Sequence, residues 1–247
     1  MKNNFGNNLP IVNLYKKKSS KSLVDTQLLY GDNFKVVKKY GSWSKIKILK
    51  DNYNGYVKNW KFAKSIKPNF KVSVLKSNLF LAPNTKKKLK KCLPFNSRLK
   101  VTHRAGKFAK FDKFWVKFSD LKRNNYKQKN IFKNIKIYKN TKYLWGGKSY
   151  KGIDCSALVQ IFFNYNNKFF PRDSKDQENF LNKKVDLKNI KKNDLIFWKG
   201  HVAIALSKKL LIHAYGPLKK VVIMDINKTM NRIKKTANLK VTSIRRP

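Results

Sequence analysis

The segment from residue 143 to residue 177 constrains the fold of this chain more than any other. It reads YLWGGKSYKGIDCSALVQIFFNYNNKFFPRDSKDQ and contains Cys155, one of only two cysteines in 247 residues. Cys155 follows a glycine-containing loop and opens the apolar run SALVQIFF, which indicates a turn leading into a buried helix. The unpaired N–H groups at the start of such a helix favour the thiolate, which is the reactive form of cysteine.

Two histidines downstream offer Cys155 a chemical partner. His201 and His213 lie in the C-terminal half of the chain, which has three histidines in all. A lone cysteine followed by histidines is a candidate nucleophile with its base. Cys92, in KKLKKCLPFN, has no polar partner near it in sequence, so we interpret it as a small buried residue. We expect no metal, because no Cys-x-x-Cys or His-x-x-x-His pair is present. We also expect no cofactor.

The net charge of +47 suggests an anionic partner, but its distribution weakens that interpretation. Lysine supplies almost all of the charge and is spread along the whole chain, whereas recognition of bases and phosphates favours arginine. Abundant Asn, Ile and Phe fit a drift of codons toward adenine and thymine. We therefore expect no specific nucleic-acid partner, and attraction to nucleic acid or acidic cell-wall polymers stays open as the alternative.

The chain reads as a folded protein without a membrane span. Its hydrophobic content is 41%, and no apolar run approaches the roughly 20 residues that cross a bilayer. The N-terminal sequence lacks the apolar core of about 7–15 residues that a signal peptide requires. We expect a cytoplasmic protein, and two cysteines do not make a disulfide framework.

The first half of the chain shows two similar blocks of short strand-like segments. In the first block, SWSKIKI alternates apolar and polar residues, which predicts a strand with Trp43, Ile46 and Ile48 near a core. The second block repeats strands and turns up to FWVKFSDLK. We predict two small β-barrels, over residues 1–67 and 68–123, followed by a third domain over residues 124–247.

The third domain is predicted to combine helices with strands. Residues 124–137 are polar and amphipathic and predict a leading helix. Ser174 and Gln177 have the S-x-x-Q spacing of a capping box, so a second helix should begin there. The runs DLIFW, HVAIAL and LLIHAYG predict three strands. Strands after helices indicate an α+β domain.

The first block contains a turn at Tyr30-Gly31-Asp32, Trp43 in a strand and a turn at Gly55-Tyr56-Val57. On these features both N-terminal blocks resemble the bacterial SH3-like domain, a small β-barrel often attached to cell-wall enzymes. The resemblance is more specific in the first block than in the second.

A set of short motifs runs through the third domain: Tyr143-x-Trp145-Gly146-Gly147, Asp154-Cys155-Ser156, Pro171-Arg172-Asp173-Ser174-x-x-Gln177, Asn193-Asp194-Leu195-Ile196-Phe197, His201-Val202 and Ile212-His213-Ala214. In these positions the domain resembles the NlpC-type family of papain-like cysteine peptidases, which cut bacterial cell-wall peptides. The resemblance implies a papain-like catalytic domain behind SH3-like barrels, hence an α+β fold.

The resemblance also implies catalytic roles for four residues. Cys155 matches the nucleophile, and His201 matches the general base that takes the thiol proton. His213 matches the residue that orients His201, and their separation of 12 positions suits neighbouring strands of one hairpin. Tyr143 matches a residue close to the oxyanion position.

Other matched positions imply a substrate-binding surface. Asp154 and Ser156 match positions that hold the N-terminal amine of the substrate, although Asp154 also suits a helix N-cap. The positions that match residues near the substrate subsites are Trp145, Arg172, Asp173 and Ser174. The first barrel of this subgroup lends an acidic residue and a tyrosine to the amine site, for which Asp32 and Tyr56 are the nearest candidates.

Within the family, the two barrels point to the subgroup that cleaves the bond between γ-D-glutamate and a diamino acid, usually meso-diaminopimelate. The implied substrate is a short murein tri- or tetrapeptide with a free L-alanine amine, and a cytoplasmic location suits recycling of imported wall peptides. Two rivals remain: a cysteine amidase or acyltransferase acting on another substrate, and a non-catalytic lysine-rich protein that binds a polyanion or the cell wall.

Overall fold

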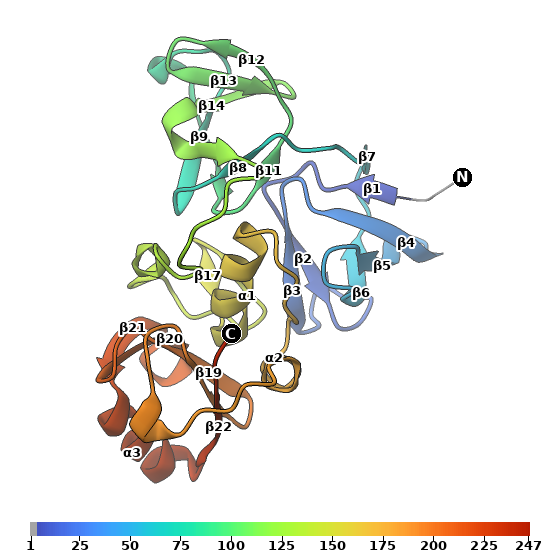
Figure 1. Ribbon diagram of the computed structural model, residues 1–247. Helices are drawn as coiled ribbons and strands as arrows, with labels where there is room; N and C mark the ends of the chain where they lie inside the picture. Colours follow the sequence, from blue (N-terminus) through green and yellow to red (C-terminus); the bar gives the residue numbers. More distant parts are fainter. Residues whose placement is uncertain (1–3) are drawn as a thin grey trace. The chain divides into compact units, whose positions relative to one another are not determined.

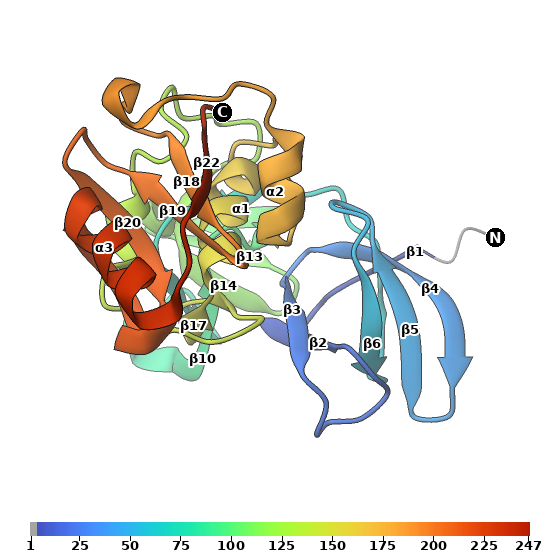
Figure 2. The same cartoon turned by 90° about the horizontal axis from the view of Figure 1, so that it is seen from below.

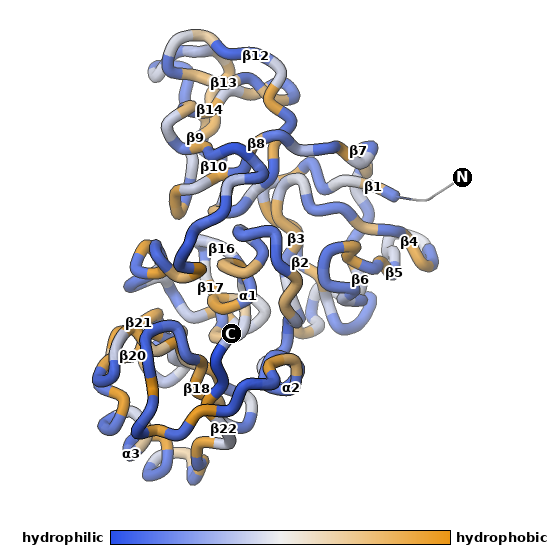
Figure 3. Tube along the Cα trace, viewed as in Figure 1, coloured by the Kyte–Doolittle hydropathy of each residue, from blue (hydrophilic) through white to orange (hydrophobic). Residues whose placement is uncertain are grey.

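The computed structural model describes residues 4–247, which form two compact units. The first unit comprises the described residues 4–127 together with Tyr165–Asn167. The second comprises Gln128–Asn164 together with Lys168–Pro247. In both units, hydrophilic stretches recur along the trace in Figure 3, in keeping with lysines dispersed over the whole sequence.

The first block of the first unit is a seven-stranded antiparallel sheet (Figures 1 and 2), in the order β3-β2-β6-β5-β4-β1-β7. Its strands are β1 (Asn4–Gly6), β2 (Ile11–Tyr15), β3 (Val24–Leu29), β4 (Asn33–Tyr40), β5 (Trp43–Ile48), β6 (Asn54–Lys58) and β7 (Ala63–Lys64). The buried residues of its core are Leu14, Leu28, Phe34, Ile46, Ile48 and Val57. The predicted strand at SWSKIKI is therefore confirmed as β5.

Two details of the first block differ from the sequence prediction. In β5 the buried face carries Ser44, Ile46 and Ile48, because side chains alternate along a strand. Trp43 is therefore on the other face, where its ring meets that of Tyr15 edge-on at 5.5 Å. Gly55 lies inside β6 rather than in a turn, and a Cβ there would stand 2.7 Å from Cγ of Leu14.

The turn at Tyr30-Gly31-Asp32 does need its glycine. Gly31 has φ +82°, and a Cβ at this position would lie 2.1 Å from the carbonyl oxygen of Arg98. The Asp32 carboxylate closes the turn by accepting a hydrogen bond of 2.8 Å from the backbone N–H of Leu29. The turn is thus held by local bonds and by close contact with the second block.

The second block contains two small antiparallel sheets, ordered β10-β9-β14-β13-β12 and β11-β8-β15. Their elements are β8 (Phe70–Val72), β9 (Lys76–Phe80), η1 (Thr85–Lys87), β10 (Lys88–Pro94), β11 (Arg98–Leu99), β12 (Val101–Ala105), β13 (Phe108–Phe111), β14 (Phe114–Lys117), η2 (Phe118–Asp120) and β15 (Leu121–Arg123). Tyr30 joins the buried core of this block, so the two blocks share packing.

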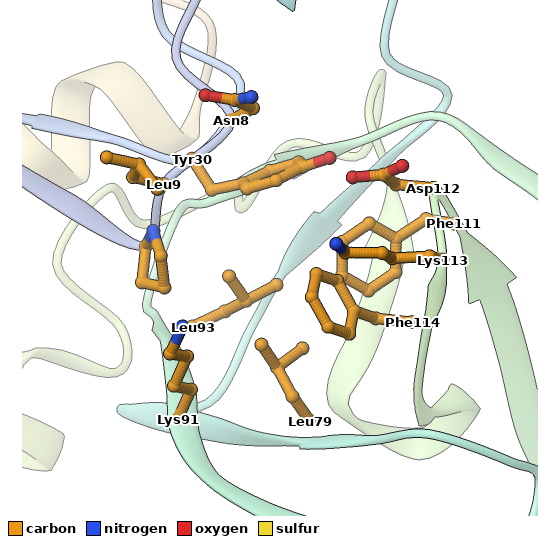
Figure 4. Close-up of a pocket in the computed structure, with 11 residues that line it drawn as sticks. Asn8, Leu9, Tyr30, Leu79, Lys91, Leu93, Phe111, Asp112, Lys113 and Phe114 are labelled. Carbon is orange, nitrogen blue, oxygen red and sulfur yellow. The ribbon is translucent and has the colours of Figure 1, made fainter. Parts of the chain in front are cut away.

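A cavity of about 320 Å³ lies where the two blocks of the first unit meet (Figure 4). Leu79, Leu93 and Phe111 line it with buried apolar side chains. The phenol of Tyr30 points into the cavity on the side of Asp112, and burial followed by the Asp112 charge raises its pKa. The Tyr30 hydroxyl therefore stays protonated.

The leading helix predicted over residues 124–137 is wrong. The only helical segment there is a 3-10 turn, η3 (Ile135–Tyr138). Asparagine recurs in this stretch, and its side chain competes with helical backbone bonds. Asn130 illustrates this, since its Oδ1 accepts a hydrogen bond of 2.9 Å from the backbone N–H of Phe132.

The second unit combines helices with an antiparallel sheet ordered β21-β20-β19-β18-β22. Its elements are β16 (Lys148–Ser149), β17 (Gly152–Ile153), α1 (Cys155–Tyr165), α2 (Ser174–Phe180), η4 (Leu187–Asn189), β18 (Leu195–Trp198), β19 (His201–Ala205), β20 (Leu210–Tyr215), η5 (Gly216–Leu218), β21 (Lys220–Asp225), α3 (Ile226–Ala237) and β22 (Val241–Arg245). The three predicted strands are confirmed as β18, β19 and β20. Ile226 and Ile233 of α3 pack into the same core as the sheet (Figure 2).

None of the helices formed by residues 4–247 combines the length and the apolar character needed to cross a membrane.

Candidate active site

Cys155 is the first residue of α1, as the sequence predicts. The short hairpin of β16 and β17 leads into it, and the helix then continues with Ala157, Leu158 and Val159, all fully buried. The Asp154 carboxylate accepts a hydrogen bond of 2.8 Å from the backbone N–H of Ala157 and so caps the helix. The cysteine is 7% exposed, which places its sulfur in a largely water-free setting.

The prediction that the helix terminus favours the Cys155 thiolate meets an opposing effect. Burial, followed by the charge of Asp154, raises the pKa of the Cys155 thiol to about 12. The backbone N–H groups of Val202 and Ser156 and the charge of Arg172 act in the other direction but are outweighed. Desolvation disfavours the charged form more than the helix end favours it, so Cys155 rests as a neutral thiol.

His201 and His213 lie on the adjacent strands β19 and β20, as their spacing predicts. Nε2 of His201 is 2.9 Å from Nδ1 of His213, which is hydrogen-bond distance. The Val202 N–H that affects the Cys155 pKa belongs to the residue after His201. The sheet thus brings the start of β19, with His201, to the end of α1 that carries Cys155.

Both histidines are neutral at ordinary pH. Burial lowers the pKa of His201 to about 4. Burial, followed by the charge of His201, lowers the pKa of His213 to about 2. His213 is fully buried, and its ring stacks on that of Tyr215 at 4.6 Å with an angle of 10°. The other nitrogen of His213, Nε2, lies 3.4 Å from Sδ of Met224.

A buried polar cluster surrounds Asp154. Its Oδ2 is 2.6 Å from Nη2 of Arg172 and accepts a hydrogen bond of 2.9 Å from the Gly146 N–H. Its Oδ1 accepts from Nη1 of Arg172 at 3.1 Å and from the Ser156 hydroxyl at 3.2 Å. Arg172 also donates to the Ser156 hydroxyl at 2.8 Å. Asp154, Ser156 and Arg172 are therefore bonded to one another, and Asp154 does serve as an N-cap.

Tyr143 also lies near Cys155 and Asp154. Burial, followed by the charges of Cys155 and Asp154, raises the Tyr143 pKa, so its hydroxyl remains a hydrogen-bond donor. Its ring lies against Gly216, where an added Cβ would come within 3.7 Å. The neighbouring Trp145 is 60% exposed and presents a broad apolar surface to solvent.

The helix predicted at Ser174 is confirmed as α2, but the capping box is not formed. Asp173 occupies the N-cap position, and no side-chain cap bond is made. Gln177 instead turns inward, where its Nε2 donates to the carbonyl oxygens of Ser156 and Pro171 at 2.9 Å each. Gln177 thereby ties α2 to the Asp-Cys-Ser turn. Asp173 is exposed and Ser174 is half-buried.

Asp32 and Tyr56 lie in the first unit, whereas Cys155 lies in the second. Asp32 is 8% exposed and closes its own turn. Tyr56 is half-buried, with its ring 5.9 Å from that of Tyr40. Their predicted contribution to the amine site stays a prediction.

The sequence did not predict the roles of three site residues. Gln177 bonds to the turn that carries Cys155, Tyr215 stacks on His213, and Met224 contacts His213. Tyr215 had a signal, because it lies two positions after His213 and so on the same face of β20. Met224 had none, since only the register of β20 against β21 brings it to His213.

Comparisons with known proteins agree with the two-part layout. Residues 140–239 match the model of the NlpC/P60 family, and residues 14–60 match that of the bacterial dipeptidyl-peptidase Sh3 domain. A gamma-D-glutamyl-L-lysine dipeptidyl-peptidase of Bacillus subtilis (strain 168) is 26% identical over 234 residues, which span 85% of this chain and 78% of that protein. Dipeptidyl-peptidase 6 of Lysinibacillus sphaericus is 38% identical over 87 residues, covering 35% of this chain and only 32% of that protein.

Among solved structures, an NlpC/P60 family protein from Bacillus cereus ATCC 10987 has a TM-score of 0.83 and 20% sequence identity. The match covers 98% of this chain and 99% of that one. It establishes the similarity of fold.

Proposed function

We propose that this chain, which carries an NlpC/P60 domain of papain-like fold behind a bacterial SH3 domain, is a cysteine peptidase acting on short peptides of the bacterial cell wall. The observation that carries the proposal is the hydrogen bond of 2.9 Å between His201 and His213. His201 opens β19, and the next residue of that strand, Val202, bonds to Cys155 through its backbone. A buried thiol, an imidazole and a second group that orients the imidazole are the parts of a cysteine peptidase site.

The reaction begins from a neutral pair. With the thiol pKa near 12 and the His201 pKa near 4, the proton stays on sulfur until substrate binds. Cys155 attacks the scissile carbonyl while His201 accepts the thiol proton, so general-base catalysis accompanies formation of the C–S bond. The C–N bond then breaks, and His201 returns the proton to the leaving amine. Water hydrolyses the thioester and restores the thiol.

Tyr143 suits the role of oxyanion donor. Its phenol keeps its proton because burial, as the largest cause, and the negative charge of Asp154 raise its pKa. A fixed neutral donor near the reacting carbon stabilises the negative charge that develops in the tetrahedral intermediate.

We further propose that the bond cleaved joins γ-D-glutamate to a diamino acid, in tri- or tetrapeptides that begin with a free L-alanine amine. The support is the name of the Bacillus subtilis relative, a gamma-D-glutamyl-L-lysine dipeptidyl-peptidase. We propose meso-diaminopimelate as the diamino acid, with L-lysine as the competing candidate.

The free amine requires a negative partner. Asp173 fits direct contact with the ammonium better than Asp154 does, because Asp173 is exposed whereas Asp154 is buried. We propose that Ser174, Trp145 and the polar groups of Ser156, Asp32 and Tyr56 complete this part of the site. A carboxylate that selects an ammonium group disfavours internal peptide bonds.

We propose that residues 1–67 and 68–123 form two SH3-like barrels ahead of a catalytic domain over residues 124–247. A cytoplasmic role in recycling wall peptides is consistent with a requirement for short peptides with free amines. A cysteine amidase or acyltransferase would keep Cys155 and His201 but would not need the amine site.

Mass spectrometry tests the proposal with four substrates: L-Ala-γ-D-Glu-meso-diaminopimelate, its L-lysine counterpart and the N-acetylated form of each. We expect the wild type to release L-Ala-γ-D-Glu from the free peptides and to spare the acetylated ones, and Cys155→Ala to release nothing. Cleavage of the acetylated peptides at the same rate as the free peptides would contradict the proposed amine site. Absence of all cleavage, with Cys155 still alkylated by iodoacetamide, would remove the substrate assignment. Salt-sensitive binding to a polyanion without any cleavage would favour the binding-protein rival.

A further inference from the structure

His213 has hydrogen-bond contacts at both ring nitrogens, and they differ in chemical kind. Nδ1 faces Nε2 of His201 at 2.9 Å, and Nε2 faces Sδ of Met224 at 3.4 Å. An imidazole nitrogen either donates or accepts, depending on the tautomer. The sulfur of methionine carries no hydrogen and can only accept. The contact with Met224 is therefore a hydrogen bond only when the proton of His213 is on Nε2.

The tautomer of His213 determines the tautomer of His201. His213 is fully buried and neutral, so a proton on Nε2 leaves Nδ1 as a bare acceptor. Nε2 of His201 must then carry the proton that bonds to Nδ1 of His213. In neutral His201 the lone pair is left on Nδ1, which becomes the basic nitrogen of the site. The opposite tautomer of His213 would donate from Nδ1, so the lone pair of His201 would be on Nε2 and engaged by His213, and its Nδ1 would carry the proton.

Packing holds this arrangement in place. Tyr215 stacks on the His213 ring at 4.6 Å and 10°, which opposes rotation of the ring. In the register of β20 and β21, His213 lies opposite Val222 and Leu211 lies opposite Met224. Met224 is thus the diagonal neighbour of His213 on one face of the sheet, within reach of a long side chain.

We propose that Met224 is a positioning residue whose thioether fixes the tautomer of His213 and thereby sets Nδ1 of His201 as the base for Cys155. This inference rests on the proposed catalytic function of the histidine pair, but it concerns a property that is measurable without substrate.

Nitrogen NMR of the histidine rings gives the direct test, since the chain has only three histidines to assign. Protonated and unprotonated ring nitrogens resonate in separate regions. We expect Nε2 of both His201 and His213 to be protonated in the wild type, with both Nδ1 atoms unprotonated. A proton on Nδ1 of His213 in the wild type would overturn the proposal.

Variants at Met224 add a second test. Met224→Leu keeps most of the volume but removes the acceptor. We expect it to mix the tautomers of His213 and to slow alkylation of Cys155 by iodoacetamide about three- to tenfold, the worth of one modest hydrogen bond. Met224→Gln supplies a carbonyl acceptor and should restore both the wild-type spectrum and the alkylation rate.

Met230→Leu is the matched control, because Met230 packs against the same core from α3. It should leave the ring spectra and the alkylation rate unchanged. Wild-type ring spectra in Met224→Leu, or an equal effect in Met230→Leu, would refute the role of Met224. If the NMR and alkylation results hold while the wall peptides stay uncut, the substrate assignment fails and the positioning role stands.

Discussion

Arg172 and Asp154 form a buried ion pair, in which Nη2 lies 2.6 Å from Oδ2 and the side chains are 2% and 8% exposed. The same carboxylate accepts hydrogen bonds from the backbone of Gly146 and Ala157. The pair therefore fixes the loop before Cys155 to the first turn of the helix that Cys155 begins. The position of Cys155 therefore depends on Arg172, which lies 18 residues from Asp154 in the sequence.

Arg172→Gln should destabilise the protein strongly. It leaves the Asp154 carboxylate buried without its cationic partner, which typically costs about 3–5 kcal/mol. The free energy of unfolding in urea measures the loss. Arg232→Gln, at an exposed site on α3, should stay within about 0.5 kcal/mol of the wild type. A loss in Arg172→Gln no larger than in Arg232→Gln would show that the pair contributes little.

The two histidines should make the protein less stable in mild acid. Their pKa values of about 4 and about 2 lie below the unfolded value of roughly 6.5, so the unfolded chain binds protons that the folded chain does not. Their effect is absent above pH 6.5, and stability falls as pH drops below it. We expect His213→Asn to lessen the fall between pH 6.5 and pH 5 by about 1 kcal/mol per pH unit.

Urea unfolding at several pH values measures this slope. His103→Asn is the control, because His103 is exposed in the first unit, and it should keep the wild-type slope. Equal slopes in His213→Asn and the wild type would contradict a buried neutral His213.

The pH dependence of kcat/KM should reflect the lowered pKa of His201. The acidic limb of kcat/KM reports the base of the free enzyme, and burial lowers the pKa of His201 to about 4. We expect peptide cleavage to persist at pH 5 and to decline near pH 4, measured by product mass over short incubations. A limb centred near pH 6.5 would indicate that His201 is hydrated before substrate binds.

Lys71 provides a pH-sensitive element in the first unit. Its ammonium group is fully buried, donates to the carbonyl oxygens of Tyr126 and Tyr165, and lies 4.4 Å from the centre of the Tyr165 ring. Burial, followed by the charges of Arg98 and Lys127, lowers its pKa to about 7. The unfolded value is roughly 10.4, so the folded chain releases this proton first and stability rises with pH between these values.

The measurement is the urea midpoint between pH 7 and pH 8, a range that lies below the ordinary pKa values of cysteine and tyrosine in the unfolded chain. We expect the midpoint to rise in the wild type and to stay flat in Lys71→Met. Lys175→Met, on the exposed face of α2, should rise like the wild type. A rise in Lys71→Met equal to that of the wild type would assign the effect to other groups.

The sequence predicted the parts of the site that depend on local pattern. The strands β18, β19 and β20 follow from short apolar runs between turns, and the spacing of His201 and His213 suits a hairpin. Cys155 at the start of α1 follows from a turn before an apolar run. Hydrophobic periodicity and turn residues are patterns of a few neighbouring positions, so they can be recognised in the sequence alone.

The features that were missed depend on the fold. The charge state of Cys155 results from burial by the whole unit, which outweighs the local effect of its helix end. Met224 reaches His213 only through strand register. Trp43 was assigned to the wrong face, because the alternation in SWSKIKI does not say which parity is buried when an aromatic ring competes with two isoleucines.

Tyr143→Phe should lower kcat roughly a hundredfold while KM changes little. The hydroxyl lies near Cys155 and keeps its proton, and the charge that it stabilises exists only in the transition state and intermediate. Product release measured by mass spectrometry over a range of peptide concentrations separates kcat from KM. Alkylation of Cys155 by iodoacetamide forms no oxyanion, so its rate should equal that of the wild type. A matching loss in alkylation would mean that Tyr143 supports the packing of the thiol rather than the developing charge.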